Sequence, residues 1–284
     1  MKTVTVENIT DVFMESLSDD MNPRAREVLT CLVKHLHDFA REVKLTHDDW
    51  LVGIDYLTRA GQMTDDKRNE FILVSDVLGI ESLADAISHA AIGEETESAV
   101  LGPFFREGAP KLPRDATISQ RGEADGPSVR MSGRIVDMDG RPVPEASFDV
   151  WETGPEGLYE QQDPDQPDYN LRGQFVVDGD GTYSFRGVKP VSYPIPYDGP
   201  AGDLLQVMGR HPYRPAHIHM LVRAPGFQTL VSQIYDKKDE YIDSDSVYSV
   251  KGSLMVDFEP APAGSDVDFI VKHDVILKRK TEAA

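Results

Sequence analysis

Short strand-like segments recur through the second half of the sequence, and glycine- and proline-containing turns separate them. Asp139-Gly140 and Gly179-Asp180-Gly181 have the residues typical of hairpin turns. Many short strands with turns of this kind favour a mainly β fold, a β-sandwich. The predicted strands are residues 129–137, 146–152, 174–177, 182–185, 217–223, 230–235, 253–258 and 268–277.

The first 92 residues have the periodicity of helices instead. Asn22 and Pro23 are suited to the start of one helix, and Thr46 with Asp49 to the start of a second. A third helix is expected after Asp65 or Asp66, and a fourth over residues 82 to about 91. We therefore predict a helical N-terminal domain over residues 1–105, followed by the β-sandwich over residues 106–284.

Charge and composition exclude several classes of partner. The net charge is −20, from 49 acidic and 29 basic residues, which disfavours binding to nucleic acid because phosphates would be repelled. The sequence has no run of 18 apolar residues, so no membrane span is expected. Cys31 is the only cysteine, which excludes an intrachain disulfide. The N-terminus has no apolar stretch typical of a signal peptide, so we expect a cytoplasmic protein.

His217 and His219 lie in one apolar predicted strand. Side chains alternate along a strand, so both imidazoles face the same side and form half of a metal site. A cupin site would need a glutamate shortly after this pair, and the next residues contain none. A zinc hydrolase would need a third ligand, for which His211 and His273 are candidates without a diagnostic spacing.

Two tyrosines in loops are further candidate ligands. Tyr159 follows a predicted strand in a glycine-rich loop, and Tyr193 lies in the proline-rich run of residues 190–196. A loop tyrosine is usually a half-buried ring with its hydroxyl group in water. Phenolate is nevertheless a hard anionic ligand that suits ferric iron better than zinc, and a bound cation lowers the phenol pKa.

These segments together resemble the intradiol ring-cleaving dioxygenases. The resemblance spans nearly the whole chain, and its ligand types occur in the family's order and spacing. It implies one Fe(III) per subunit, held by Tyr159, Tyr193, His217 and His219. The matching segments are Gly157-Leu158-Tyr159, Asn170-Leu171-Arg172-Gly173, residues 190–196 and residues 209–219.

Three further segments are residues 71–79, Leu101-Gly102-Pro103-Phe104-Phe105 and residues 193–200. In these segments the chain most resembles, within this family, the branch that cleaves hydroxyquinol (1,2,4-trihydroxybenzene) with O2. The resemblance implies catalytic roles for Tyr193, Arg214 and Gln233, with Arg214 also binding substrate. We expect the Asp76 carboxylate to accept a hydrogen bond from the third ring hydroxyl, which catechol lacks. The expected ring pocket consists of Leu73, Asp76, Val100, Leu101, Gly102, Pro103, Phe104, Ile195, Pro196, Arg214 and Val247.

The resemblance also implies assembly. In the family the helical region pairs two subunits and carries an amphiphile-binding tunnel, so we expect a homodimer through the N-terminal helices with a phospholipid at the interface. Two other functions stay open. A catechol or chlorocatechol 1,2-dioxygenase shares every iron ligand, and a non-catalytic β-sandwich binding module or a zinc hydrolase belongs to another class.

Overall fold

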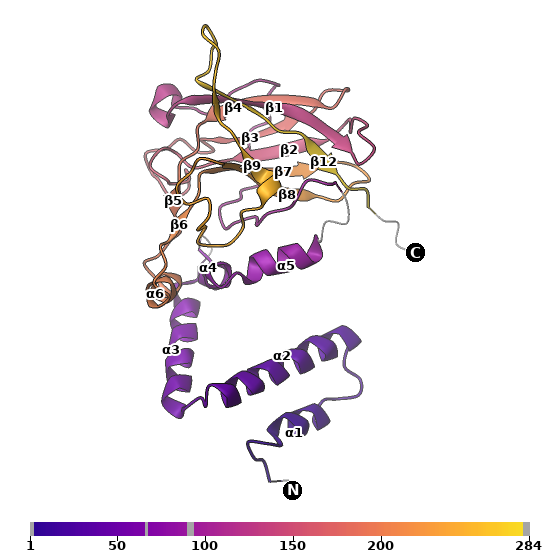
Figure 1. Ribbon diagram of the computed structural model, residues 1–284, viewed down its shortest axis with the longest axis vertical. Helices are drawn as coiled ribbons and strands as arrows, with labels where there is room; N and C mark the ends of the chain where they lie inside the picture. Colours follow the sequence, from indigo (N-terminus) through magenta and orange to yellow (C-terminus); the bar gives the residue numbers. More distant parts are fainter. Residues whose placement is uncertain (1–2, 66–67, 90–93, 281–284) are drawn as a thin grey trace. The chain divides into compact units, whose positions relative to one another are not determined.

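The computed structural model describes residues 3–65, 68–89 and 94–280 (Figure 1). The chain forms two compact units, Met1–Arg59 and Ala60–Ala284. Helices dominate the first unit, and two β-sheets dominate the second. The mainly β prediction with a helical N-terminal part is therefore confirmed.

The first unit consists of α1 (Ile9–Glu15), α2 (Pro23–Glu42) and most of α3 (His47–Met63). The Asn22 side chain accepts a hydrogen bond from the Ala25 amide, which confirms it as the N-cap of α2. Thr46 and Asp49 exchange hydrogen bonds between each amide and the other's side chain, as a capping pair predicts. Within the described residues, no helix is long and apolar enough to cross a membrane.

Three helices belong to the second unit: α4 (Glu70–Val77), α5 (Ile80–Ser88) and α6 (Pro200–Val207). The helix expected after Asp65 or Asp66 is α4, and its N-cap is Asn69, whose side chain accepts from two helix amides. The predicted end of α5 at residue 91 lies outside the described residues. The sequence-based prediction did not include α6, which begins with a proline at its first position.

Among its described residues, this unit also contains two sheets of five strands each. One has the order β10-β11-β1-β12 with β4 also paired to β1, and the other has the order β3-β2-β7-β8-β9. The strands of the first sheet are β1 (Ser128–Asp137), β4 (Thr182–Val188), β10 (Glu259–Pro260), β11 (Phe269–Lys272) and β12 (Val275–Leu277). Those of the second are β2 (Ser147–Trp151), β3 (Arg172–Val176), β7 (His217–Arg223), β8 (Leu230–Asp236) and β9 (Met255–Val256).

Two of the predicted strands are interrupted. The segment 268–277 forms both β11 and β12, with His273 and Asp274 between them. The segment 253–258 contributes only the two residues of β9, preceded by a short 3-10 helix over Gly252–Leu254. A separate two-stranded ribbon pairs β5 (Tyr193–Pro194) with β6 (Tyr213–Arg214).

Strand β7 positions the candidate site because its two faces have different surroundings. Ile218, Met220 and Val222 are buried in the main hydrophobic core, which includes residues of both sheets. Since side chains alternate, His217 and His219 point to the opposite face of the same strand. Pairing with β2 on one side and β8 on the other fixes this strand in the middle of its sheet.

Candidate metal centre

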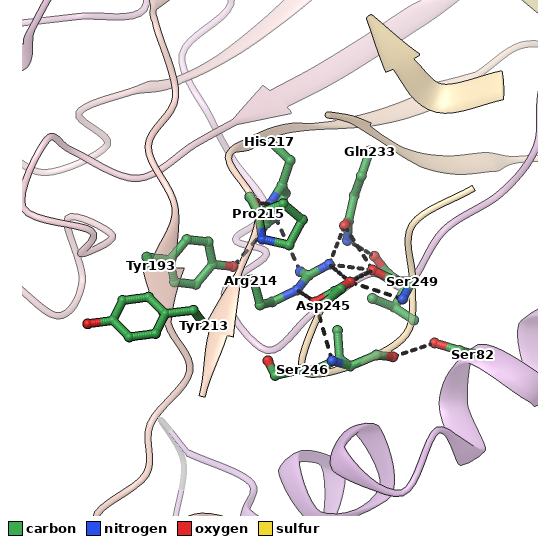
Figure 2. A network of polar contacts seen from close by, with 12 residues as sticks. Ser82, Tyr193, Tyr213, Arg214, Pro215, His217, Gln233, Asp245, Ser246 and Ser249 are labelled. Carbon is green, nitrogen blue, oxygen red and sulfur yellow. Dashed lines mark hydrogen bonds and ion pairs between the residues drawn. The ribbon is translucent and has the colours of Figure 1, made fainter. Parts of the chain in front are cut away.

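The two histidines of β7 are almost completely buried, each with 2% of its surface exposed. Their Nε2 atoms lie 3.1 Å apart. The Nδ1–H group of His217 donates to the Pro215 carbonyl at 2.7 Å, so its Nε2 lone pair faces the site (Figure 2). The ring of His219 instead stacks on Trp151, its register partner on β2, with centroids 4.6 Å apart.

The two tyrosine hydroxyl groups lie next to these nitrogens. The Tyr159 hydroxyl is 2.9 Å from His219 Nε2 and 3.1 Å from the Tyr193 hydroxyl. The Tyr193 hydroxyl is 3.5 Å from His217 Nε2. The structure therefore brings together all four residues that the resemblance implies as ligands.

Backbone geometry lets the two tyrosine loops approach each other. Gly157 has φ 75°, in the left-handed region that favours glycine. A Cβ atom on Gly157 would lie 2.9 Å from the Cβ of Tyr193, so a side chain would push the loops apart. The glycine two residues before Tyr159 thus permits the hydroxyl groups to meet.

The donor set fits a trivalent, hard cation. Burial, followed by the charge of Arg214, lowers the pKa of His217 to about 3, and burial also lowers that of His219. Both imidazoles are therefore neutral and can offer lone pairs. Burial and the neighbouring Tyr193 raise the pKa of Tyr159, so phenolate forms there only beside a cation. Two neutral nitrogens and two potential phenolates match ferric iron.

Arg214 and Gln233 lie beside the donor set. Arg214 Nη1 is 3.2 Å from His217 Nε2, and Arg214 Nη2 donates to Gln233 Oε1 at 2.7 Å. Gln233 is the register partner of His219 on β8, and its amide nitrogen donates to the Val100 carbonyl at 2.5 Å. Gln233 therefore connects the arginine to the 99–104 segment that borders the ring pocket.

A small cavity is lined by three of the four donor residues, Tyr159, Tyr193 and His219. It is lined by every residue of the expected ring pocket except Leu101, whose side chain is 36% exposed. Phe104 stacks on the Tyr159 ring with centroids 4.6 Å apart. Asp76 is 4% exposed, and within the described part of the chain no group hydrogen-bonds its Oδ1 atom.

A second cavity of about 1070 Å³ shares five lining residues with this ring pocket. Arg68, Arg106 and Tyr197 lie along the wider cavity. The shared residues are Leu73, Pro103, Phe104, Ile195 and Pro196. The wider cavity therefore lies next to the ring pocket.

The two other candidate histidines lie elsewhere. His211 is within 2.9 Å of the Ser244 hydroxyl, and His273 separates β11 from β12. Neither lines the ring pocket. Sequence reasoning missed Trp151 and Asp245, which support His219 and Arg214 through contacts that no local motif indicates.

Comparisons with known proteins agree with this geometry. A family model described as "Catechol dioxygenase N terminus" matches residues 22–96, and one described as "Dioxygenase" matches residues 100–279. The chain is 44% identical to hydroxyquinol 1,2-dioxygenase of Rhizobium sp. strain MTP-10005, covering 96% of this chain and 95% of that protein. It is 45% identical to catechol 1,2-dioxygenase of Candida albicans, covering 93% and 87% respectively.

A comparison with a solved structure indicates the same family. The fold matches hydroxyquinol 1,2-dioxygenase from Pseudomonas putida DLL-E4 with a TM-score of 0.90 at 41% identity, covering 97% of this chain and 99% of that chain. These matches cover nearly the full length of the chain, so they argue against a zinc hydrolase and against a non-catalytic β-sandwich module. The chain belongs to the family of intradiol ring-cleaving dioxygenases.

Proposed function

We propose that this enzyme cleaves hydroxyquinol with O2 between its two adjacent hydroxylated carbons. The product is 3-hydroxy-cis,cis-muconate, which tautomerises to maleylacetate, and both oxygen atoms of O2 enter it. The observation that carries this proposal is the Asp76 carboxyl group, which borders the ring pocket with one oxygen atom unpartnered among the described residues. A third ring hydroxyl would provide that partner.

We further propose that Tyr159, Tyr193, His217 and His219 hold one Fe(III). Their mutual distances of 2.9–3.5 Å and the chemistry of the donors support this assignment. When bound, ferric iron supplies a Lewis acid that can bind both oxygens of an adjacent diol.

The protein side chains divide the remaining work. As a phenolate, the Tyr193 side chain would accept one of the two protons that the diol loses on binding and become a neutral phenol, since its oxygen lies beside His217 Nε2. Arg214 Nη1 points toward the same space, where its charge stabilises negative charge that develops on the ring oxygens. Phe104 and Ile195 provide apolar walls that orient the ring and exclude water.

The domain division and the assembly also stay proposals. We propose a helical domain over residues 1–105, a catalytic domain over residues 106–284, and a homodimer formed through the N-terminal helices with a bound phospholipid. Exposed apolar side chains on α2, among them Leu32, Leu36 and Phe39, support such pairing. Light scattering tests the dimer, and organic extraction with mass spectrometry tests the lipid.

Catechol or chlorocatechol is the alternative substrate, since the Candida albicans relative is a catechol 1,2-dioxygenase. Oxygen uptake with hydroxyquinol, catechol and chlorocatechols distinguishes these possibilities. We expect the highest kcat/KM for hydroxyquinol. A higher value for catechol would contradict the substrate assignment but not the reaction.

The metal assignment has its own measurement. Protein loaded with ferric iron should bind one iron per chain and show a reddish tyrosinate-to-iron absorption band. Tyr159→Phe should weaken this band and lower iron content, whereas Tyr213→Phe, on the strand paired with β5, should change neither. A colourless protein with full iron content would contradict the tyrosinate ligands.

A further inference from the structure

The buried guanidinium group of Arg214 is held along one edge by a carboxylate. Arg214 Nε donates to Asp245 Oδ1 at 3.2 Å, and Nη2 donates to Asp245 Oδ2 at 3.4 Å (Figure 2). Nη2 also donates to the Ser249 hydroxyl. Arg214 and Asp245 are 3% and 5% exposed, so each is the counter-charge of the other in a buried region.

The other hydrogen-bond partners of Arg214 lie on two sides of its guanidinium group. The two N–H groups of Nη2 are shared among Asp245, Ser249, Gln233 Oε1 at 2.7 Å and the Tyr235 hydroxyl at 3.3 Å, so the Nε–Nη2 edge is fully engaged. Within the described residues, the hydrogen bonds of Nη1 involve only His217 Nε2, at 3.2 Å. That nitrogen is a proposed iron ligand, and a lone pair given to a metal no longer accepts a hydrogen bond. The N–H groups of Nη1 are then free to face the ring pocket, which Arg214 lines.

Asp245 has a fixed position of its own. Its carboxylate accepts from the Ser249 amide at 3.0 Å and hydroxyl at 2.9 Å, and from the Val247 amide at 3.3 Å. Arg210 donates to the Asp245 carbonyl at 3.2 Å. Ser82 on α5 donates to the Val247 carbonyl at 2.8 Å, as Figure 2 shows. Contacts that do not involve Arg214 therefore hold the segment 245–249 and its carboxylate in place.

We propose that Asp245, supported by Ser249, is a positioning residue that fixes the Nε–Nη2 edge of Arg214 and so directs Nη1 at the substrate ring. This inference rests on the proposed role of Arg214 in the reaction. The planar guanidinium group makes the argument specific, because fixing one edge by two parallel hydrogen bonds fixes the direction of the opposite edge.

A double-mutant cycle tests the proposal. Asp245→Asn, Arg214→Gln and the double variant are compared by steady-state oxygen uptake, with whichever diol the wild type cleaves best. We expect Asp245→Asn to lower kcat/KM about 10- to 100-fold, mainly through kcat. In the Arg214→Gln background the same substitution should change kcat/KM less than about 2-fold. Equal factors in both backgrounds would overturn the proposal, because Asp245 would then act independently of Arg214.

Asp125→Asn is the matched control. Asp125 is also buried, and it likewise accepts from an arginine Nε and a serine hydroxyl, those of Arg121 and Ser119, but it does not line the ring pocket. The control should affect kcat/KM by the same small factor in both backgrounds. If the effects of Asp125→Asn and Arg214→Gln on kcat/KM were as non-additive as those of Asp245→Asn and Arg214→Gln, the cause would be general destabilisation. That result would overturn the inference.

Ser249→Ala provides a second variant that keeps the charge pair, so the inference is tested even if Asp245→Asn does not fold. We expect a 3- to 10-fold loss of kcat/KM, roughly, that disappears in the Arg214→Gln background. Visible absorption of 4-nitrocatechol bound to the iron-loaded variants is a readout independent of turnover. Ser249→Ala should change the spectrum of bound 4-nitrocatechol when Arg214 is present, but not in the Arg214→Gln variant. An unchanged spectrum together with additive effects on kcat/KM would contradict the inference. A wild type that binds 4-nitrocatechol but consumes no O2 would contradict the proposed function instead.

Discussion

Replacing Asp76 by leucine should reduce the preference for hydroxyquinol over catechol. Asp76 is 4% exposed on α4 and lines the ring pocket. Burial, followed by a hydrogen bond with Glu81, raises the pKa of Asp76 to about 9. At neutral pH the carboxyl group is therefore protonated. The sequence suggested a carboxylate that accepts from the third ring hydroxyl, whereas the structure favours a neutral acid that can also donate to it.

The size of the effect follows from the unpartnered oxygen. In the proposed complex with hydroxyquinol, the third hydroxyl would pair with Asp76, whereas catechol would leave a buried polar group without a partner. Such a group costs about 1–3 kcal/mol. Because 1.4 kcal/mol corresponds to a factor of ten, Asp76→Leu should lower the ratio of the two kcat/KM values by about 5- to 150-fold. Asp76→Asn keeps a polar group of the same size and should lose less.

Oxygen uptake with both substrates at pH 7 measures the ratio directly. Iron content and the visible absorption band must match the wild type, so that loss of metal is not mistaken for loss of selectivity. A ratio unchanged within twofold in Asp76→Leu would refute the reasoning. Raising the pH through 9 ionises the carboxyl group in the wild type, so the ratio should change there and stay constant in the leucine variant.

Three further predictions concern the metal and the sandwich. A ferric chelator should remove both the visible absorption band and oxygen uptake, and added ferric salt should restore both in parallel. A Cβ atom on Gly133 would lie 1.9 Å from the His273 carbonyl oxygen, so Gly133→Ala should lower the free energy of unfolding in urea by about 2–3 kcal/mol. Burial raises the pKa of Glu152 from 4.5 to about 8, so this group favours unfolding increasingly as pH rises from 4.5 to 8. The free energy of unfolding of Glu152→Gln at pH 8 should therefore exceed that of the wild type by an amount on the order of a few kcal/mol, measured by denaturant titration. This difference should shrink at pH 5.

The strand that carries the histidines could be predicted from the sequence alone. Residues 217–223 have the bounds of β7, because an apolar run on a central strand is a strong local signal. Alternation along that strand correctly placed His217 and His219 on one face. The tyrosines had no such signal, because the distance between Tyr159 and Tyr193 depends on loops, and only the family resemblance connected them.

Other features depend on contacts between distant segments. The stack of Trp151 on His219 arises from the pairing of β2 with β7, and a tryptophan at a strand end indicates nothing of this in the sequence. The ion pair between Arg214 and Asp245 joins residues 31 positions apart. Local patterns predict elements and faces, whereas register and loop packing decide which side chains meet.

The pairing of β5 with β6 restricts how the site can move during the reaction. Tyr193 and Arg214 are register partners in this two-stranded ribbon, so their backbones are joined by ladder hydrogen bonds. A displacement of the Tyr193 backbone would therefore move Arg214 as well, and Asp245 resists that movement. The proposed proton transfer from the diol to Tyr193 would therefore involve rotation of the tyrosine side chain, without movement of its strand. The ring then has to turn toward the ring pocket, which it already lines, while the arginine on the paired strand stays in place.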